Sequence, residues 1–296
     1  MKQKTVRTTP RSQPAKRVAI LGLGLMGGSL GLALRRLRRP PAVAGYARRA
    51  ETRRLALRMG AVDQVFDDPA EAVRNADWVV LCTPILSMPD LAGACAGACK
   101  NGAVMTDVGS TKAFLAKILA NLPVPFIGSH PIAGSERMGI EAASPDLYRN
   151  AVVVLSPRAR DSRAETRRLA ALWRSVGARP LVISPTLHDR IIAQTSHLPH
   201  LVAATLVLHA SRANPRLAAR LCGNGFRDAT RIAAGSPEMW HDIAVTNAPA
   251  ISRELRSLSA ALLATANDIE AKRFAAVRRR LARAREQRLL MGFGQT

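Results

Sequence analysis

His130 stands alone among small and turn-forming residues in the stretch Phe126-Ile-Gly-Ser-His-Pro-Ile-Ala-Gly-Ser-Glu136. The apolar start of the stretch, broken by Gly, Ser and Pro, predicts a buried strand at 125–128 that runs into a loop. Open α/β sheets bind their ligands in the loops at the carboxyl ends of strands. An imidazole there can accept a proton near neutral pH, and its glycine neighbours leave room for a substrate. A solvated loop histidine would look the same, so other residues must decide between the two.

A glycine-rich sequence at residues 22–27 favours the catalytic interpretation. It reads Gly-Leu-Gly-Leu-Met-Gly, follows an apolar strand and precedes a helix, the context in which this pattern binds a dinucleotide. The first glycine permits a tight turn, the second lets the backbone approach the pyrophosphate, and the third allows close packing of helix on sheet. The helix N-terminus adds free amides and positive partial charge. The candidate cofactor contacts are Gly22, Gly24, Leu25, Met26 and Gly27, with Thr83 and Asp107 after two later strands.

The end of the second predicted strand indicates which dinucleotide is bound. An Asp or Glu at this point usually meets the free ribose 2′-hydroxyl of NAD, whereas arginine meets the 2′-phosphate of NADP. Ala47 stands where the acid is expected, and Arg48 and Arg49 follow it directly. We therefore predict NADP, with NAD as the alternative, since a basic turn in an arginine-rich chain can also be merely solvated.

Further polar residues mark two other places. In Asp107-Val-Gly-Ser-Thr-Lys112, Ser110 can hydrogen-bond the substrate or the nicotinamide, or cap a helix beginning at Thr111, and Lys112 can offer a charge. In Ser196-His-Leu-Pro-His200, His197 suits a polar role in a site and His200 a satisfied core position. Neither place has the ligands of a metal site.

Arg231 lies one helical turn beyond Arg227, in Gly223-Asn-Gly-Phe-Arg-Asp-Ala-Thr-Arg-Ile-Ala, and Trp240 follows. A guanidinium can hold a carboxylate through two parallel hydrogen bonds, so Arg231 is a candidate anchor for an acidic substrate. One of the two arginines can equally be a surface charge.

Alternating strands and helices predict an α/β fold with a Rossmann-type, doubly wound parallel sheet over residues 17–184. Expected strands are 17–21, 42–46, 78–82, 103–106, 125–128 and 152–155, and expected helices include 28–38 and 51–59. Alanine- and leucine-rich stretches at helical spacing predict an all-helical domain over 185–296 that serves in substrate binding and dimerisation. Residues 184–186 form the expected hinge, which can also cap the first helix of this domain through Ser184. The basic residues 1–16 form an expected disordered tail.

Composition narrows the class of protein. The 296-residue chain is 48% hydrophobic and 22% charged, and no apolar run reaches the roughly 18 residues of a membrane span, so we expect no membrane segment. Four cysteines without a disulfide pattern favour the reducing cytoplasm. The formal net charge of +23 is spread along the chain and aromatic residues are only 4%, which favours capture of small anions over specific nucleic-acid binding.

Five ordered motifs, GLGLMGGSL, DVGSTK, GSHPIAGSE, SHLPH and GFRDATRIA, with the later Met-Trp, resemble the prephenate/arogenate dehydrogenase family, the cyclohexadienyl dehydrogenases of tyrosine biosynthesis. The resemblance runs from about Arg17 into the helical C-terminal region. Members of that family oxidise the 4-hydroxyl of a cyclohexadiene ring with NAD or NADP while carbon dioxide leaves from C1. The resemblance therefore implies a small, anionic cyclohexadiene substrate.

The resemblance also implies residue roles. His130 would take the proton of the ring hydroxyl as hydride departs, and Ser110 would fix that hydroxyl and His130. Arg231 would hold the ring carboxylate, and His197 would line the same pocket. Ser135 and Glu136 are further candidates for binding the substrate, Glu136 matching an acid that in some relatives helps gate the site.

Several expectations follow from where the chain departs from the family pattern. The arginines at 48 and 49 favour NADP and, with the compact two-domain chain, arogenate over prephenate, although a dual-substrate enzyme fits the same residues. The chain stops with its last helix, so we expect no fused regulatory or mutase domain and any inhibition by tyrosine at the active site. Apolar surface on the helical domain predicts a homodimer. A β-hydroxyacid dehydrogenase would carry a catalytic lysine where His197 and His200 stand, and a non-catalytic dinucleotide sensor would not need His130.

Overall fold

The computed structural model describes residues 15–134, 137–212 and 214–292. The described chain forms two compact units, which divide after Ala248. Of the expected tail, only Ala15 and Lys16 lie within the described residues. Lys16 is held there, because its amide donates a 2.7 Å hydrogen bond to Asp77.

The first unit contains the predicted parallel sheet, with strands in the order β3-β2-β1-β4-β5. The strands are β1 (Arg17–Leu21), β2 (Ala42–Tyr46), β3 (Gln64–Phe66), β4 (Trp78–Leu81) and β5 (Val104–Asp107). Side chains alternate along β1: Val18 and Ile20 join a core on one face, and Ala19 and Leu21 a second core on the other. Burial on both faces is typical of a parallel sheet and explains why β1 and β4 are apolar throughout.

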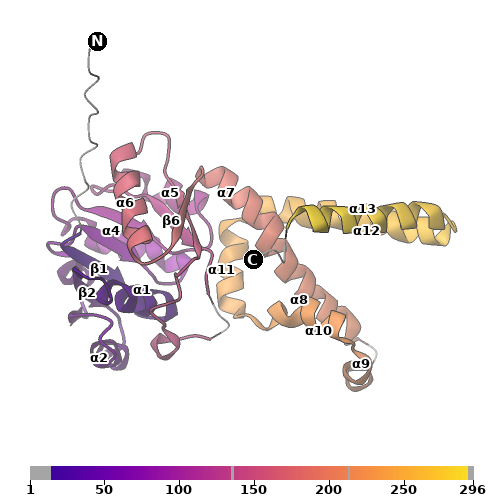
Figure 1. The fold of residues 1–296 in the computed structure, drawn as a ribbon, viewed down its shortest axis with the longest axis horizontal. Helices are drawn as coiled ribbons and strands as arrows, with labels where there is room; N and C mark the ends of the chain where they lie inside the picture. Colours follow the sequence, from indigo (N-terminus) through magenta and orange to yellow (C-terminus); the bar gives the residue numbers. More distant parts are fainter. Residues whose placement is uncertain (1–14, 135–136, 213, 293–296) are drawn as a thin grey trace, which may run out of the picture. The chain divides into compact units, whose positions relative to one another are not determined.

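Helices connect these strands and cover the sheet, as Figure 1 shows for α1, α2 and α4. They are α1 (Leu25–Arg35), α2 (Ala50–Arg58), α3 (Pro69–Val73), α4 (Met88–Ala96) and α5 (Ala113–Ile118), with short 3₁₀ turns η1 (Ile85–Ser87) and η2 (Leu119–Asn121). The helix expected at 28–38 is α1, which begins three residues earlier than predicted, inside the glycine-rich sequence. The Rossmann-type fold class is confirmed.

The remaining strands form a second, three-stranded sheet in the order β6-β7-β8, which corrects the expectation of one parallel sheet. These strands are β6 (Gly128–Pro131), β7 (Val152–Ser156) and β8 (Arg179–Val182), with η3 (Ile140–Ala142) and α6 (Arg163–Ser175) between them. β6 runs antiparallel to β7, and His130 pairs with Val154. His130 therefore lies in a strand and not in a loop. Pro131 is tolerated because β6 is an edge strand.

Two helices and the turn between them form one continuous rod from residue 185 to 210 (Figure 1). α7 (Pro185–Ile192) passes through a π-helical segment (Ala193–His197) into α8 (Leu198–Ala210). Ser184 caps α7 as expected, accepting a hydrogen bond from Leu187 N at 3.3 Å. The rod has a mean hydropathy of 1.4, so by length and composition alone it could cross a membrane. From the sequence we expected no segment of this kind. Its polar residues His188 and Asp189 are nevertheless bonded within the first unit.

The other helices complete the predicted helical half. They are α9 (Pro215–Leu221), α10 (Asn224–Thr230), the 3₁₀ turn η5 (Arg231–Ala234), α11 (Pro237–Thr246), α12 (Ala248–Glu270) and α13 (Phe274–Leu290). Within the second unit Asp268 on α12 binds Arg273 and Arg280 at its junction with α13. Large apolar side chains on these two helices are exposed, among them Leu262, Leu263, Leu281, Leu289 and Leu290.

Candidate active site

A buried ion pair joins the two sheets of the first unit beside His130. Lys112 Nζ donates to the Asp107 carboxylate, and to the backbone oxygen of Ser129 at 2.7 Å. Asp107 in turn accepts from Ser129 N at 3.0 Å and from Gly109 N at 2.8 Å. Burial raises the pKa of Asp107 and lowers that of Lys112, and the attraction between the two opposes both changes.

This arrangement changes the roles expected for two residues. Asp107 and Lys112 are at most 1% exposed and satisfy each other, so neither presents a charge to a cofactor or a substrate. Their bonds instead hold the end of β5 against β6 and fix the backbone just before His130. The sequence could not show that the two residues neutralise one another.

His130 belongs to a hydrogen-bonded chain that continues through His188 to Asp189. His130 Nδ1 lies 2.8 Å from His188 Nε2, and His188 Nδ1 lies 2.7 Å from Asp189 Oδ1. A carboxylate only accepts, so His188 donates from Nδ1, and a His188 ring with a single proton then accepts at Nε2. His130 must then donate from Nδ1. The lone pair of neutral His130 is therefore on Nε2.

Asp189 is fixed by a second pair of bonds. Its carboxylate accepts from the backbone amides of Lys112 at 2.7 Å and Ala113 at 2.8 Å, which are the first amides of α5. A carboxylate at a helix N-terminus is favoured by both hydrogen bonding and the helix dipole. The cap of α5 therefore comes from α7, and the alternative in which Ser110 caps a helix beginning at Thr111 is wrong. Ser110 is partly exposed on the loop before α5.

The surroundings favour the neutral forms of His130 and His197. Burial of the ring lowers the pKa of His130 well below 6.5, and His188, Lys112 and His197 lower it further. Burial also lowers the pKa of His197, to about 4, although Asp189 opposes the change. His197 belongs to the same polar cluster, because its Nδ1 lies 3.2 Å from Asn247 Nδ2, which also donates to the backbone oxygen of Asp189. Near pH 7 His130 is thus an unprotonated base.

A fourth histidine and a tryptophan extend this cluster. The His200 ring stacks on Trp240 with centroids 3.6 Å apart and planes 9° from parallel, and His197 meets the same indole edge-on at 6.1 Å. His200 is buried as expected, yet its Nδ1 has no hydrogen-bond partner among the described residues. Its ring also bonds the backbone of Ile232 in η5. Arg231, the preceding residue, is exposed, as is Arg227.

The glycine-rich turn has the geometry that a dinucleotide requires. Gly22 has φ +109° and a Cβ there would lie 2.7 Å from the Cys82 carbonyl and 2.9 Å from Thr83, so only glycine fits. A Cβ at Gly24 would meet no atom within 4 Å, which leaves that backbone open to a ligand. No side chain caps the N-terminus of α1, where Leu25 and Met26 begin the helix. These free amides fit a pyrophosphate.

The basic turn after β2 is held by a residue that sequence reasoning missed. Arg53 donates to the backbone oxygens of Ala47 at 2.7 Å and Arg48 at 2.9 Å, and contacts Asp67 at 3.3 Å. Arg48 and Arg49 are both exposed. Their guanidinium groups are therefore available at the strand end where the adenosine ribose of a Rossmann cofactor lies.

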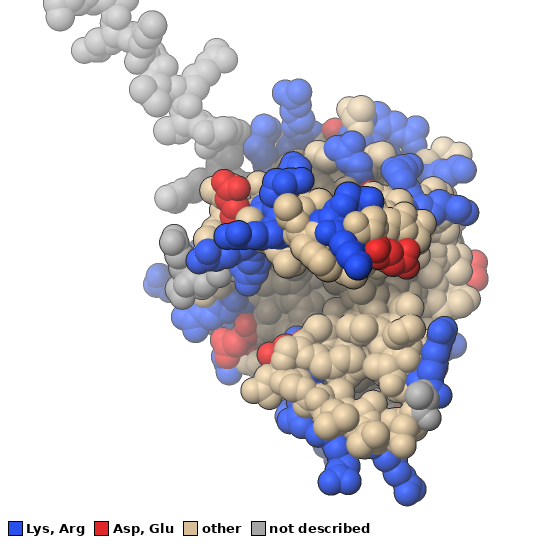
Figure 2. All heavy atoms as spheres, turned by 90° about the vertical axis from the view of Figure 1, so that its right-hand side faces the viewer, with Lys and Arg blue, Asp and Glu red and all other residues tan. Residues whose placement is uncertain are grey.

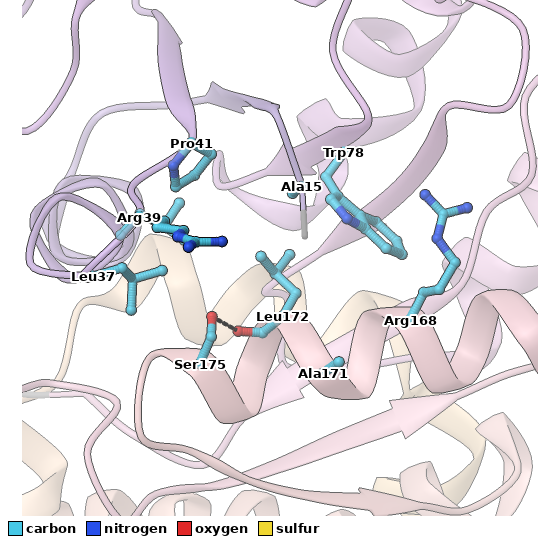
Figure 3. A pocket seen from close by; sticks show the side chains of 10 residues that line it. Ala15, Leu37, Arg39, Pro41, Trp78, Arg168, Ala171, Leu172 and Ser175 are labelled. Carbon is cyan, nitrogen blue, oxygen red and sulfur yellow. Dashed lines mark hydrogen bonds between the residues drawn. The ribbon is translucent and has the colours of Figure 1, made fainter. Parts of the chain in front are cut away.

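Two predicted residues cannot be placed, and one cavity lies apart from this cluster. Ser135 and Glu136 are outside the described residues. A cavity of about 220 Å³ is lined by Trp78, Leu172, Arg39 and Arg168, with Arg168 against the Trp78 ring (Figure 3). It lies where β2 and β4 begin, at the edge of the sheet opposite the one where the glycine-rich turn follows β1. We therefore assign it no part in the site.

The fold and the glycine-rich turn are those of a nucleotide-binding dehydrogenase. A model of the prephenate dehydrogenase nucleotide-binding domain matches residues 30–182, and one of the prephenate dehydrogenase dimerisation domain matches residues 184–283. The chain belongs to the prephenate dehydrogenase family.

Individual relatives agree with this membership. The chain is 37% identical to the cyclohexadienyl dehydrogenase of Zymomonas mobilis over 80% of its own length and 82% of that protein. It superimposes on a prephenate dehydrogenase from A. aeolicus, in complex with hydroxyphenyl propionate and NAD+, with a TM-score of 0.87 and 30% identity over 95% and 100% of the two chains. The arogenate dehydrogenase of Synechocystis gives 0.82 and 29% over 92% and 98%.

Proposed function

We propose that the protein catalyses the NADP-dependent oxidative decarboxylation of arogenate to tyrosine. The observation that carries this proposal is the hydrogen-bonded chain from His130 Nδ1 through His188 to Asp189, which leaves Nε2 of a neutral His130 to accept a proton. Prephenate, giving 4-hydroxyphenylpyruvate, is the alternative substrate, and a dual-substrate cyclohexadienyl dehydrogenase is compatible with the same site. Relatives of the chain carry the names of all three activities.

His130 performs the proton transfer in this scheme. Its Nε2 accepts the proton of the ring 4-hydroxyl, and the imidazolium that results donates from Nδ1 to His188, which Asp189 stabilises in turn. The glycine-rich turn and the N-terminus of α1 would hold NADP, which would supply the acceptor for the hydride from C4 of the substrate ring. The C1 carboxylate then leaves as carbon dioxide, and its bond electrons complete the aromatic ring. Aromatisation drives the reaction, so the protein has to orient the substrate and supply a base, with little acid catalysis.

The ring carboxylate of the substrate binds at the helical part of the first unit in this scheme. Arg231 follows α10 and is the first residue of η5, which packs against α8, the helix that carries His200. We propose that it orients the ring carboxylate. An anchor that bound this carboxylate tightly in a saturated site would oppose decarboxylation, since it would stabilise the ground state over the transition state. Ser110, Ser135 and Glu136 stay candidates for the remaining contacts.

An assay of four combinations tests the proposed activity. Arogenate or prephenate is supplied with NADP or NAD, and reduced cofactor is followed by absorbance. The highest kcat/KM is expected for arogenate with NADP. Turnover with prephenate alone would transfer the proposal to the alternative substrate, and no turnover in any combination would exclude it.

Replacement of both exposed arginines tests the cofactor preference. The double variant Arg48→Ala/Arg49→Ala is expected to raise KM for NADP about 10- to 100-fold, the loss of one or two charge-assisted hydrogen bonds to the 2′-phosphate. KM for NAD should change little, because NAD has no phosphate there. Arg54→Ala, on the helix α2 that follows these two arginines, is the matched control. Equal effects on both cofactors would contradict the assignment.

We propose a homodimer formed through the helical part of the chain. The matching family model describes a dimerisation domain. In addition, Leu208 and Leu221 in the first unit are 72% and 76% exposed, and α12 and α13 carry the exposed leucines given above. Such apolar surface favours a partner of the same kind. Light scattering at micromolar concentration should give twice the mass of one chain, and a monomer would exclude the dimer.

The positive charge suits an anionic substrate and a phosphorylated cofactor. Figure 2 shows Lys and Arg side chains spread over one face with few Asp or Glu among them, and they do not gather into a single stripe. A field of this kind accelerates capture of small anions and gives no specific nucleic-acid site.

All four cysteines are free thiols. This state is stable in a reducing compartment, and we propose that the protein is cytoplasmic.

A further inference from the structure

Asn247, at the end of α11, bonds two residues of the polar cluster. Its side-chain Nδ2 donates to the backbone oxygen of Asp189 at 2.9 Å and lies 3.2 Å from His197 Nδ1. The residue is only 5% exposed. None of the sequence motifs included it, and the scheme above assigns it no task.

The bond to Asp189 determines which way the Asn247 amide faces. A backbone carbonyl oxygen can only accept, so the nitrogen of the amide, and not its oxygen, must point toward Asp189. An amide nitrogen has two hydrogens, and the second is directed at His197 Nδ1. That ring nitrogen is therefore an acceptor. Because neutral imidazole carries one proton, the proton of His197 is on Nε2.

His197 Nε2 is a buried donor without a partner. The ring is fully buried, and Nε2 has no hydrogen-bond partner among the described residues. The edge-on contact with Trp240, with centroids 6.1 Å apart, is too long to substitute for a hydrogen bond. A buried N–H left unpaired destabilises the folded state, so such a group in a polar cluster indicates a ligand atom that accepts from it.

We propose that Asn247 is a positioning residue that fixes His197 with Nε2–H as a hydrogen-bond donor to an oxygen of the substrate. The proposal rests on the proposed function for the identity of that substrate. It also defines the chemistry at this position: a carboxylate, carbonyl or hydroxyl oxygen is accepted, and an ammonium group is not. The ammonium of arogenate must therefore lie elsewhere in the site.

Asp189 then controls both histidines of the cluster. Through its carboxylate and His188 it leaves His130 with an accepting Nε2, and through its backbone oxygen and Asn247 it leaves His197 with a donating Nε2. Two rings of the same chemical type thus present opposite hydrogen-bonding groups. The low pKa of His197 agrees with this, because the ring does not take a second proton near pH 7.

Nitrogen-15 NMR of the histidine side chains tests the tautomer in the resting protein. The His197 signals are identified as those lost in His197→Gln. In the native protein we expect a protonated Nε2 and an unprotonated Nδ1. Asn247→Asp should reverse this, because a carboxylate accepts from Nδ1–H. A native His197 protonated on Nδ1 would overturn the proposal. This measurement needs no turnover, so it remains decisive if the substrate assay fails.

Kinetics test the consequence for the substrate. Asn247→Asp is expected to raise substrate KM about 10- to 100-fold, the value of one strong hydrogen bond, with cofactor KM unchanged. Asn247→Ala in a His197→Ala background should have no further effect on KM, whereas a merely structural role would add its own loss. Should the aspartate variant not fold, Asn247→Ser, which keeps a donor, is expected to retain the native tautomer and KM.

Thr246→Ala is the matched control, because Thr246 ends the same helix and bonds Thr111 at 2.9 Å without contacting His197. It should leave both the His197 tautomer and KM unchanged. An equal rise in KM for Thr246→Ala and Asn247→Asp would show that the end of α11 acts only as a structural support, and would overturn the proposal.

Discussion

Replacing His130 with Asn should lower kcat by about 10²- to 10⁴-fold, the usual contribution of a positioned general base. Asparagine keeps a donor toward His188 but has no basic nitrogen where Nε2 stands, so the fold and cofactor affinity should be retained. The measurements are kcat from reduced-cofactor absorbance and the Kd of NADP. His209→Asn, which changes an exposed histidine on α8, is the matched control.

The pH profile adds a second readout for this variant. His130 acts only when unprotonated, and its pKa is lowered from 6.5. Native kcat/KM should therefore stay level as the pH falls through 6.5 and decline only below it, and His130→Asn should lose that decline. Unchanged kcat in the variant would support a dinucleotide sensor or a different base.

Asp189→Asn should have the second-largest effect, lowering kcat by about 10²- to 10⁴-fold. An amide in place of the carboxylate can donate to His188 Nδ1. His188 would then carry its proton on Nε2 and donate to His130 Nδ1, which would leave the proton of His130 on Nε2 and remove the basic lone pair there. The comparable Asp→Asn change in the Ser-His-Asp triad lowers kcat about 10⁴-fold, because the histidine there also adopts the wrong tautomer. Stability should fall by about 1 kcal/mol as well, because the cap of α5 is weakened.

Asp68→Asn separates the two effects of that substitution. Asp68 caps α3 through Ala70 N at 3.0 Å and lies on the exposed surface away from the histidines. The control should show the loss of stability, measured by urea unfolding, with kcat unchanged. If Asp189→Asn lost only stability, His188 and Asp189 would have no part in orienting the base.

Local patterns predicted much of this molecule. The glycine-rich turn, the cap at Ser184 and the apolar strands depend on neighbours in sequence, and the structure has them within a few residues of the expected places. His130 was identified, but its strand was not, because pairing of β6 with β7 depends on residues more than twenty positions away. The family resemblance, which joins distant motifs, supplied the rest of the functional interpretation.

The residues that control the histidines had no comparable signal. His188 and Asp189 are an adjacent polar pair in an apolar helix, a feature that could have been noted, but their partners lie on β6 and α5. Asn247 resembles any asparagine at a helix end. Asp107 and Lys112 looked like charges for a ligand, and only their contact in three dimensions shows that they are used within the protein.

A crystal structure of the protein with NADP and a 4-hydroxyphenyl ligand tests the central claim most directly. The account predicts that His130 Nε2 lies roughly 2.6–3.2 Å from the ring oxygen, with its Nδ1 still bonded to His188 and the nicotinamide facing C4 of the ring. A complex in which His130 Nε2 points away from the ring oxygen, or in which another side chain makes the hydrogen bond to that oxygen, would contradict it.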